Sequence, residues 1–374
     1  MANGKRKTYP KADVTYLQGV TVFLFAIVAN LAAQLIISIV AEAGALVTNN
    51  SDFSDGSYFQ LIAMLVLQLA FLAVPAVYFG VVKKTSPQLV APLRKPHPSV
   101  ALAIVLPVLT VCGFILPTSY FVNALYKLGY PPSSVPLDTP GQAILGVVAM
   151  VAVAPFVEEL IFRGFLLSGL RKNFSPYIAA LLSAIAFSLM HMSPEQTVYQ
   201  FFLGYVCGLA AVQSGNLWAA VVVHAGNNAF SLLLDTRLGK PFNVALEFLT
   251  KTAWGAAISV VLLAIACSAA IWFICLAIRK LSARRQAKDT PNATTATAQS
   301  DTATASDESV QQETVRQKTA TVQKHERKTG LAIYLAGIGL CAVLWVFVLA
   351  AGLTQKPAEN TENVLPYAAS EEVL

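Results

Sequence analysis

Two adjacent glutamates and a nearby arginine lie in one of the most apolar stretches of this chain. Glu158 and Glu159 occur in the run from Gly146 to Leu167, and Arg163 follows Glu159 by four residues. Ionised side chains deep in hydrocarbon cost roughly 2.5–3.5 kcal/mol each on the lenient insertion scale, so they are rare and usually functional. A spacing of four places Glu159 and Arg163 on one helix face, where they can pair. We therefore predict chemistry for Glu158 and a structural ion pair for Glu159 and Arg163.

Two further apolar stretches each carry one histidine. His191 follows Phe187 by four residues, and His224 precedes Asn228 by four. Residues four apart share a helix face, so the Phe187 ring can pack against His191. For the same reason His224 and Asn228 should project together. Counting 1.5 Å per residue from the expected helix starts places these groups and Glu158 at a similar depth.

That set of residue types suits the hydrolysis of an amide bond. Hydrolysis needs a general base, a water molecule and donors for the developing oxyanion. Glu158 can act as the base, and His191 can orient the water. His224 and Asn228 can donate hydrogen bonds to the oxyanion. No serine or cysteine in this region is an obvious nucleophile, so a covalent route is disfavoured.

Each of these residues also has a purely structural interpretation. The Glu159–Arg163 pair can be a buried ion pair without chemistry. A histidine in a membrane helix can bond a backbone carbonyl, and Asn228 can join two helices. The agreement of all of them at one depth favours the functional interpretation.

The sequence is compatible with a metal site and with metal-free chemistry. Glu158, His191 and His224 could form a His₂Glu zinc site with one open position. The chain contains no HExxH motif, however, and the same three groups can act without metal. The expected cofactor is therefore none or zinc, and the metal-free interpretation is preferred.

Composition predicts an integral membrane protein made of helices. The chain of 374 residues is 56% hydrophobic and 12% charged, with a mean hydropathy of +0.60, whereas soluble proteins are about 25% charged. Long apolar runs recur and strand-like alternation is absent, so the predicted fold is all-α and polytopic, not a β-barrel. The net charge of +6 gives no reason to expect a nucleic-acid partner. About nine transmembrane helices are expected, at approximately 16–43, 59–82, 100–126, 143–170, 177–193, 198–214, 217–234, 254–278 and 331–353.

The charges of the connecting segments predict the orientation in the membrane. One side receives Lys5 to Lys11, Lys83 to Lys95, Arg171, Lys172 and Arg279 to Arg285, and the other receives Asp52, Asp55, Asp138, Glu195 and the acidic C-terminal tail. The positive-inside rule then places the N-terminus in the cytoplasm and the C-terminus outside. The plasma membrane is the expected location.

The same pattern suggests five regions. Residues 1–140 hold three transmembrane helices, 141–234 the polar core, and 235–281 the eighth helix with its flanks. Residues 282–328 are rich in Ala, Thr, Ser, Gln and charges, which predicts a disordered cytoplasmic linker. Residues 329–374 hold the ninth helix and the acidic tail.

Three motifs in residues 141–234 resemble those of a known family. Glu158-Glu159-xxx-Arg163, Phe187-xxx-His191 and His224-xxx-Asn228 look like the motifs of the CAAX protease and bacteriocin-processing (CPBP or Abi) family of intramembrane proteases, which includes the Rce1-type prenyl protease. The resemblance implies a peptidase in which the glutamate and the first histidine activate water. It also implies that the second histidine and the asparagine stabilise the oxyanion, and that the substrate is a peptide or protein in the lipid bilayer. Family members are often labelled metalloproteases, and a metal-free mechanism has also been argued for the prenyl protease branch.

Two other functions compete with this interpretation. Intramembrane Glu and His also form proton relays, so a proton-coupled transporter is the first alternative. Transporters usually show duplicated halves, and no matching polar set occurs in the first three expected helices. A non-catalytic bacteriocin-immunity protein that keeps the fold is the second alternative.

Overall fold

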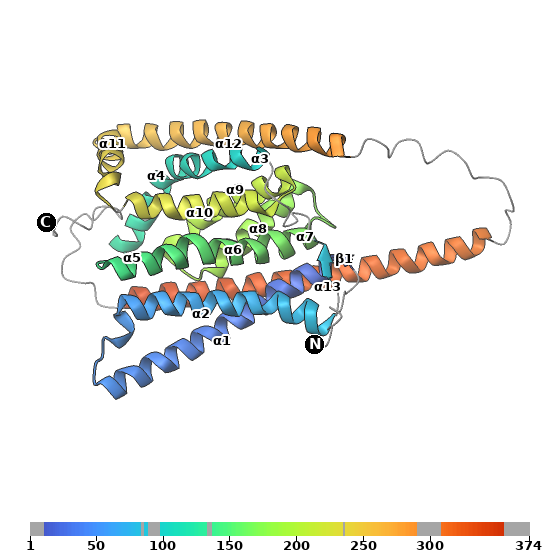
Figure 1. Ribbon diagram of the computed structural model, residues 1–374, viewed down its shortest axis with the longest axis horizontal. Helices are drawn as coiled ribbons and strands as arrows, with labels where there is room; N and C mark the ends of the chain where they lie inside the picture. The colour runs from blue at the N-terminus through green and yellow to red at the C-terminus, as the bar shows by residue number, and fades with distance from the viewer. Residues whose placement is uncertain are drawn as a thin grey trace, which may run out of the picture.

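The computed structural model describes residues 11–83, 86–88, 98–132, 137–234, 236–289 and 308–354. Most of the basic N-terminal stretch and the acidic C-terminal tail, on which part of the orientation argument rests, lie outside these residues. The helices run side by side in an elongated bundle (Figure 1). They are α1 (Tyr16–Thr48), α2 (Ser57–Pro75), α3 (Pro98–Ala101), α4 (Leu106–Lys127), α5 (Pro140–Gly146), α6 (Ala154–Glu159), α7 (Leu167–Leu170), α8 (Pro176–Met190), α9 (Pro194–Ser214), α10 (Leu217–Leu234), α11 (Lys240–Thr250), α12 (Ala253–Asp289) and α13 (Glu308–Thr354).

Short irregular elements complete the bundle. Three segments are π-helical, Ala76–Val82, Val147–Val153 and Leu160–Leu166, and three short 3₁₀ turns occupy Phe53–Asp55, Leu102–Val105 and Arg237–Gly239. Two three-residue strands, β1 (Lys11–Asp13) and β2 (Ser86–Gln88), pair in parallel. This small pair is the only departure from an all-helical architecture among the described residues.

The prediction of an all-α polytopic membrane protein is confirmed. Within the described ranges, seven helical stretches are long and apolar enough to cross a membrane: Tyr16–Thr48, Ser57–Val82, Leu102–Lys127, Pro140–Leu170, Leu217–Leu234, Trp254–Arg284 and Lys324–Thr354. The expected helices at 177–193 and 198–214 exist as α8 and α9, but neither is among the seven. At 15 residues, α8 is about 22 Å long, shorter than the roughly 30 Å hydrocarbon core. The number of nine crossings therefore stays a prediction.

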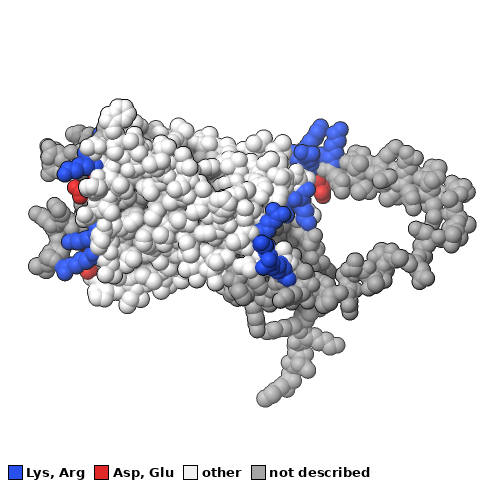
Figure 2. All heavy atoms as spheres, turned by 90° about the horizontal axis from the view of Figure 1, so that it is seen from above, with Lys and Arg blue, Asp and Glu red and all other residues white. Residues whose placement is uncertain are grey.

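The surface has the polarity that a lipid environment requires. Large apolar side chains are exposed along the outer helices, among them Phe273 at 69% and Phe347 at 70%. Figure 2 shows an uncharged band across the body, with Lys and Arg side chains at both of its ends. The start of α1 and the end of α13 lie at opposite ends of the bundle (Figure 1). Basic side chains thus occur at both ends of the band, whereas the loop pattern predicted that they gather mainly at one end.

Two segments differ from their expected form. Glu195, assigned above to an external loop, lies buried in the first turn of α9, where a carboxylate complements the helix dipole. Both ends of the segment expected as a linker, 282–328, are helical, because α12 continues to Asp289 and α13 begins at Glu308. Ala, Gln, Glu, Lys and Arg are strong helix formers, so low hydrophobicity alone did not end these helices. The remaining residues of that linker, 290–307, lie outside the described ranges.

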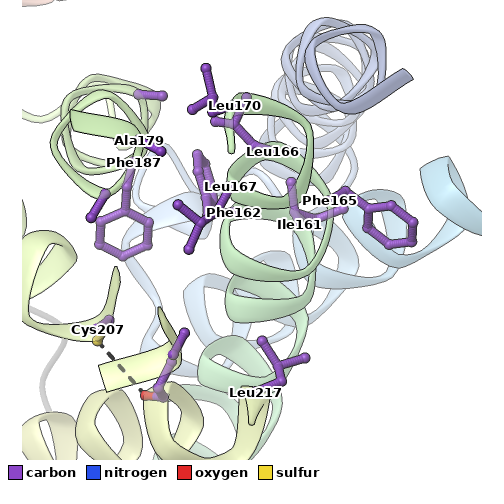
Figure 3. Packing of buried hydrophobic residues seen from close by; sticks show 14 of the residues in the cluster. Ile161, Phe162, Phe165, Leu166, Leu167, Leu170, Ala179, Phe187, Cys207 and Leu217 are labelled. Carbon is purple, nitrogen blue, oxygen red and sulfur yellow. Dashed lines mark hydrogen bonds between the residues drawn. The ribbon is translucent and has the colours of Figure 1, made fainter. Parts of the chain in front are cut away.

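The continuous helical stretch from Pro140 to Leu170 forms the centre of the buried core. Figure 3 shows Phe162 and Phe165 leaving this stretch in different directions, with Phe162 facing Phe187 of α8. The Phe162 and Phe187 rings pack edge to face, with their centroids 5.1 Å apart. On the side of α1, Gly19 and Gly169 lie so close that a Cβ at Gly19 would be 2.8 Å from the Gly169 Cα. Small residues thus allow the close helix contact that packing in lipid favours.

Candidate active site

Three helices bring the predicted polar residues together. Glu158 lies near the end of α6, His191 follows α8 directly, and His224 lies in α10. One carboxylate oxygen of Glu158, Oε2, is 3.9 Å from His191 Nε2 and 3.9 Å from His224 Nε2. Both distances exceed a direct hydrogen bond. The His224 side chain is 2% exposed and that of Glu158 is 12% exposed, so the group lies largely away from bulk solvent.

Glu159 joins an arginine and a histidine. Arg163 Nη1 donates to Glu159 Oε1 at 3.0 Å, and both side chains are fully buried. His224 Nδ1 lies 2.9 Å from the same oxygen. Because a carboxylate paired with arginine is an acceptor, His224 carries its hydrogen on Nδ1 and turns Nε2 towards Glu158. The ion pair follows the predicted i, i+4 spacing, whereas the contact with His224 was not foreseen.

Arg163 is held by the backbone and by an aromatic face. Its Nη2 donates to the carbonyl oxygen of Gly204 at 2.7 Å, and its guanidinium carbon lies 4.5 Å from the centre of the Phe187 ring. A Cβ at Gly204 would meet Arg163 Nη2 at 3.1 Å and the Phe187 ring at 3.0 Å. Glycine at this position therefore lets the guanidinium reach the carbonyl.

His191 is oriented by its own helix. Its Nδ1 lies 2.8 Å from the carbonyl oxygen of Phe187, which can only accept, so Nδ1 is the donor and Nε2 faces Glu158. The centroid of the Phe187 ring lies 4.7 Å from that of the His191 ring and 5.5 Å from that of the His224 ring. Phe187 thus packs against both histidines, whereas the sequence suggested contact with His191 alone.

Asn228 bonds to the main chain of the central helix. Its Nδ2 donates to the Met150 carbonyl oxygen at 2.7 Å. Met150 lies within the π-helical segment Val147–Val153, and the Ala154 N–H bonds to the Ala149 oxygen, five residues back. The next bond in that register would run from residue 155 to Met150, but Pro155 has no N–H. Asn228 therefore supplies the donor that Pro155 lacks, and its second N–H is free of this bond.

One contact to the site comes from a residue that the motifs did not include. Gln68 of α2 donates from Nε2 to Glu158 Oε1 at 2.7 Å. Helical spacing relates residues on one helix only, so it gave no link between positions 68 and 158. The available signal was the glutamine itself, a lone polar side chain midway along an apolar helix.

The ligand types for zinc are present, but they are not arranged as a closed set. Within the described residues, no group of three or more His, Cys, Asp or Glu is placed to hold a metal ion. Tetrahedral zinc with bonds of about 2.0–2.1 Å needs donors roughly 3.4 Å apart, and the Glu158–histidine distances are 3.9 Å. A metal ion here would use Glu158 Oε2 and the two Nε2 atoms and would supply a Lewis acid.

Comparison with known proteins supports the motif resemblance. Residues 140–230 match the family model described as Type II CAAX prenyl endopeptidase Rce1-like. The chain is 24% identical to "Putative membrane peptidase YdiL" of Bacillus subtilis (strain 168) over 102 residues, which are 25% of this chain and 42% of that protein. It is 27% identical to "Uncharacterized 24.3 kDa protein" of Escherichia coli over 123 residues, 32% of this chain and 52% of that protein.

The chain thus spans about half the length of the curated relatives it matches. No solved structure matches it. The resemblance to the CAAX protease family, predicted from three motifs, is confirmed for residues 140–230.

Proposed function

We propose, from the match of residues 140–230 to the Rce1-like endopeptidases, that this integral membrane protein is an intramembrane endopeptidase. It hydrolyses a peptide bond of a membrane-associated peptide or protein. The observation that carries the proposal is the position of Glu158 Oε2, 3.9 Å from the Nε2 atoms of both His191 and His224 inside the bundle. Polar atoms at this separation are suited to bridging by one water molecule.

Water activation uses Glu158 and His191. With its hydrogen on Nδ1, neutral His191 accepts a hydrogen bond from the water at Nε2. Glu158 Oε2 accepts the second hydrogen and takes it as a proton while the water oxygen attacks the substrate carbonyl carbon. The protonated Glu158 then gives this proton to the leaving amine, which completes the hydrolysis.

The oxyanion is stabilised by donors on α10. His224 donates from Nε2 when that nitrogen carries a hydrogen, and the Glu159 carboxylate at Nδ1 fixes the orientation of the ring. Asn228 donates the amide N–H that is not bound to Met150. Preorganised donors of this kind are each worth about 10²–10³ in kcat.

A cleavage assay tests the proposal. Purified protein is incubated with membrane-anchored peptides, and products are identified by mass spectrometry with and without a chelator. The family description names CAAX prenyl endopeptidases, so peptides with a lipid-modified C-terminal tail are the first substrate class. Cleavage by wild type and none by Glu158→Gln is the expected result. Uptake of a solute into proteoliposomes without cleavage would favour the proton-coupled transporter, and neither activity would favour the immunity protein.

We further propose that the N-terminus lies in the cytoplasm and the C-terminus outside, in the plasma membrane. The start of α1 and the end of α13 lie at opposite ends of the bundle (Figure 1), which supports this relative placement. Cysteines introduced within residues 282–328 should be labelled from the cytoplasmic side, and those within 355–374 from outside. Labelling of both segments from one side would contradict the arrangement.

A further inference from the structure

The candidate base is held by a helix outside the family-matched segment. Gln68 of α2 donates to Glu158 Oε1 at 2.7 Å, across 90 residues of sequence. Its side chain is 5% exposed. The carboxylate accepts only, so the amide must present Nε2 to it and direct its own oxygen elsewhere. α2 therefore contributes one specific polar contact to a site whose other members lie between residues 158 and 228.

The two oxygens of Glu158 have different partners. Oε1 binds Gln68, and Oε2 is the atom that faces both histidines. The terminal torsion of glutamate has no sharp rotational minima, so the carboxylate plane is set by its hydrogen bonds. A bond to Oε1 fixes that plane and leaves Oε2 towards the two Nε2 atoms.

Local stability does not explain a glutamine here. Gln68 Oε1 is buried and has no hydrogen-bond partner among the described residues. A buried acceptor without a partner is unfavourable. Leucine, of similar size, would bury at this position of an apolar helix without that penalty. The amide is accounted for by what it does to Glu158.

We propose that Gln68 is a positioning residue of the hydrolytic site, which holds the Glu158 carboxylate turned towards His191 and His224. This inference rests on the proposed function for its catalytic consequence, and on the observed contact alone for its effect on Glu158. It extends the site beyond residues 140–230 to α2.

Turnover of a cleaved peptide tests the proposal. Gln68→Leu removes the donor to Glu158 Oε1 and keeps a side chain of similar size. The matched control is Gln213→Leu, a buried glutamine on α9 that bonds Tyr177, and it should cleave the peptide as wild type does.

A loss of turnover that is present in Gln68→Leu and absent in Gln213→Leu is assigned to the lost amide. Equal turnover of Gln68→Leu and wild type would overturn the proposal.

Separate kcat and KM values give the second measurement. Gln68→Leu should lower kcat about 10- to 100-fold, less than the roughly 10²–10⁴ of a complete general-base contribution because Glu158 itself remains, with KM changed less than twofold. A higher KM at unchanged kcat would also overturn the proposal. Absence of cleavage by wild type would reject the peptidase function together with this role, whereas cleavage by wild type with an unchanged kcat in Gln68→Leu would reject this role alone.

Discussion

The family-matched segment and the helices around it contribute different things to the site. Every motif residue lies between α6 and α10, while α1, α2 and residues 331–354 of α13 are apolar with few polar side chains. Yet three of those few reach into the segment. Gln68 bonds Glu158, Tyr334 donates to the Leu182 carbonyl, and Trp345 donates to Thr197. The segment thus carries the groups proposed to react, and the surrounding helices bond to them or to their neighbours.

This difference has a consequence for mutations. Loss of a reactive group should remove a step of the reaction, with the bundle intact. Loss of a contact from the surrounding helices should reduce turnover by a smaller factor, because the reactive groups remain and are only less well placed. Variants of the two kinds should therefore differ in the size of their effect on turnover.

Glu158→Gln should give the largest loss of activity. The amide cannot take a proton from water, so general-base catalysis worth about 10²–10⁴ in rate is lost. Thermal unfolding in detergent should stay near wild type. The control is Glu247→Gln, an exposed glutamate on α11, which should keep full turnover. Near-wild-type turnover of Glu158→Gln would remove Glu158 from the role of base.

Glu159→Gln should chiefly destabilise the protein. It leaves the buried Arg163 without its carboxylate, and breaking a buried ion pair from one side costs about 3–5 kcal/mol. Turnover of the folded fraction should also fall, since His224 Nδ1 loses the same carboxylate. Thermal unfolding and turnover are measured on the same preparation. An unchanged unfolding temperature with lost activity would instead make Glu159 a catalytic group.

His224→Ala and Asn228→Ala separate the metal-free from the zinc interpretation. Without metal, loss of one oxyanion donor should lower kcat about 10²–10³-fold with little change in KM. With zinc, His191→Ala and His224→Ala should lose the bound ion while Asn228→Ala keeps it. Elemental analysis of wild type and the three variants distinguishes the cases. About one zinc per chain, lost in both histidine variants, would contradict our metal-free preference.

The sequence was informative where one helix contains the whole relationship. The Glu159–Arg163 pair and the Phe187–His191 contact both follow from a spacing of four, and both are present. Counting depth along separate helices also brought Glu158, His191 and His224 together. These inferences need only the helical repeat and the cost of burying polar groups.

Contacts between helices were not accessible in this way. The bonds from Gln68 to Glu158 and from His224 to Glu159 depend on how the helices rotate against each other, which spacing does not report. The π-helical turn before Pro155 decides where Asn228 binds, and no local pattern predicted it. α8 ends at Met190, close to the expected end near residue 193, because an apolar run indicates a helix but not the residue at which it gives way to a turn.

The smallest effect is expected for the contact farthest from the chemistry. Trp345 of α13 donates from Nε1 to Thr197 Oγ1 at 2.6 Å, and Thr197 Oγ1 donates to the Ser193 carbonyl at 2.7 Å. Ser188 Oγ donates to the Thr197 carbonyl at 2.6 Å. Ser188 lies in the last turn of α8 and Ser193 just before α9, on either side of His191. The turn between the two helices contains His191 and Met192, and Met192 has a φ of 51°. The last helix therefore helps to hold the turn that carries His191.

Trp345→Phe removes the indole N–H and keeps an aromatic ring. One hydrogen bond is worth about 1 kcal/mol, so turnover should fall roughly fivefold with KM nearly unchanged. Phe347→Leu, an exposed aromatic on the same helix, is the control and should have no effect. Thr197→Val should lower turnover similarly, and the double variant should be no worse than the worse single variant, because the two side chains form one bond. Independent, additive losses would show that α13 does not act on His191 through Thr197.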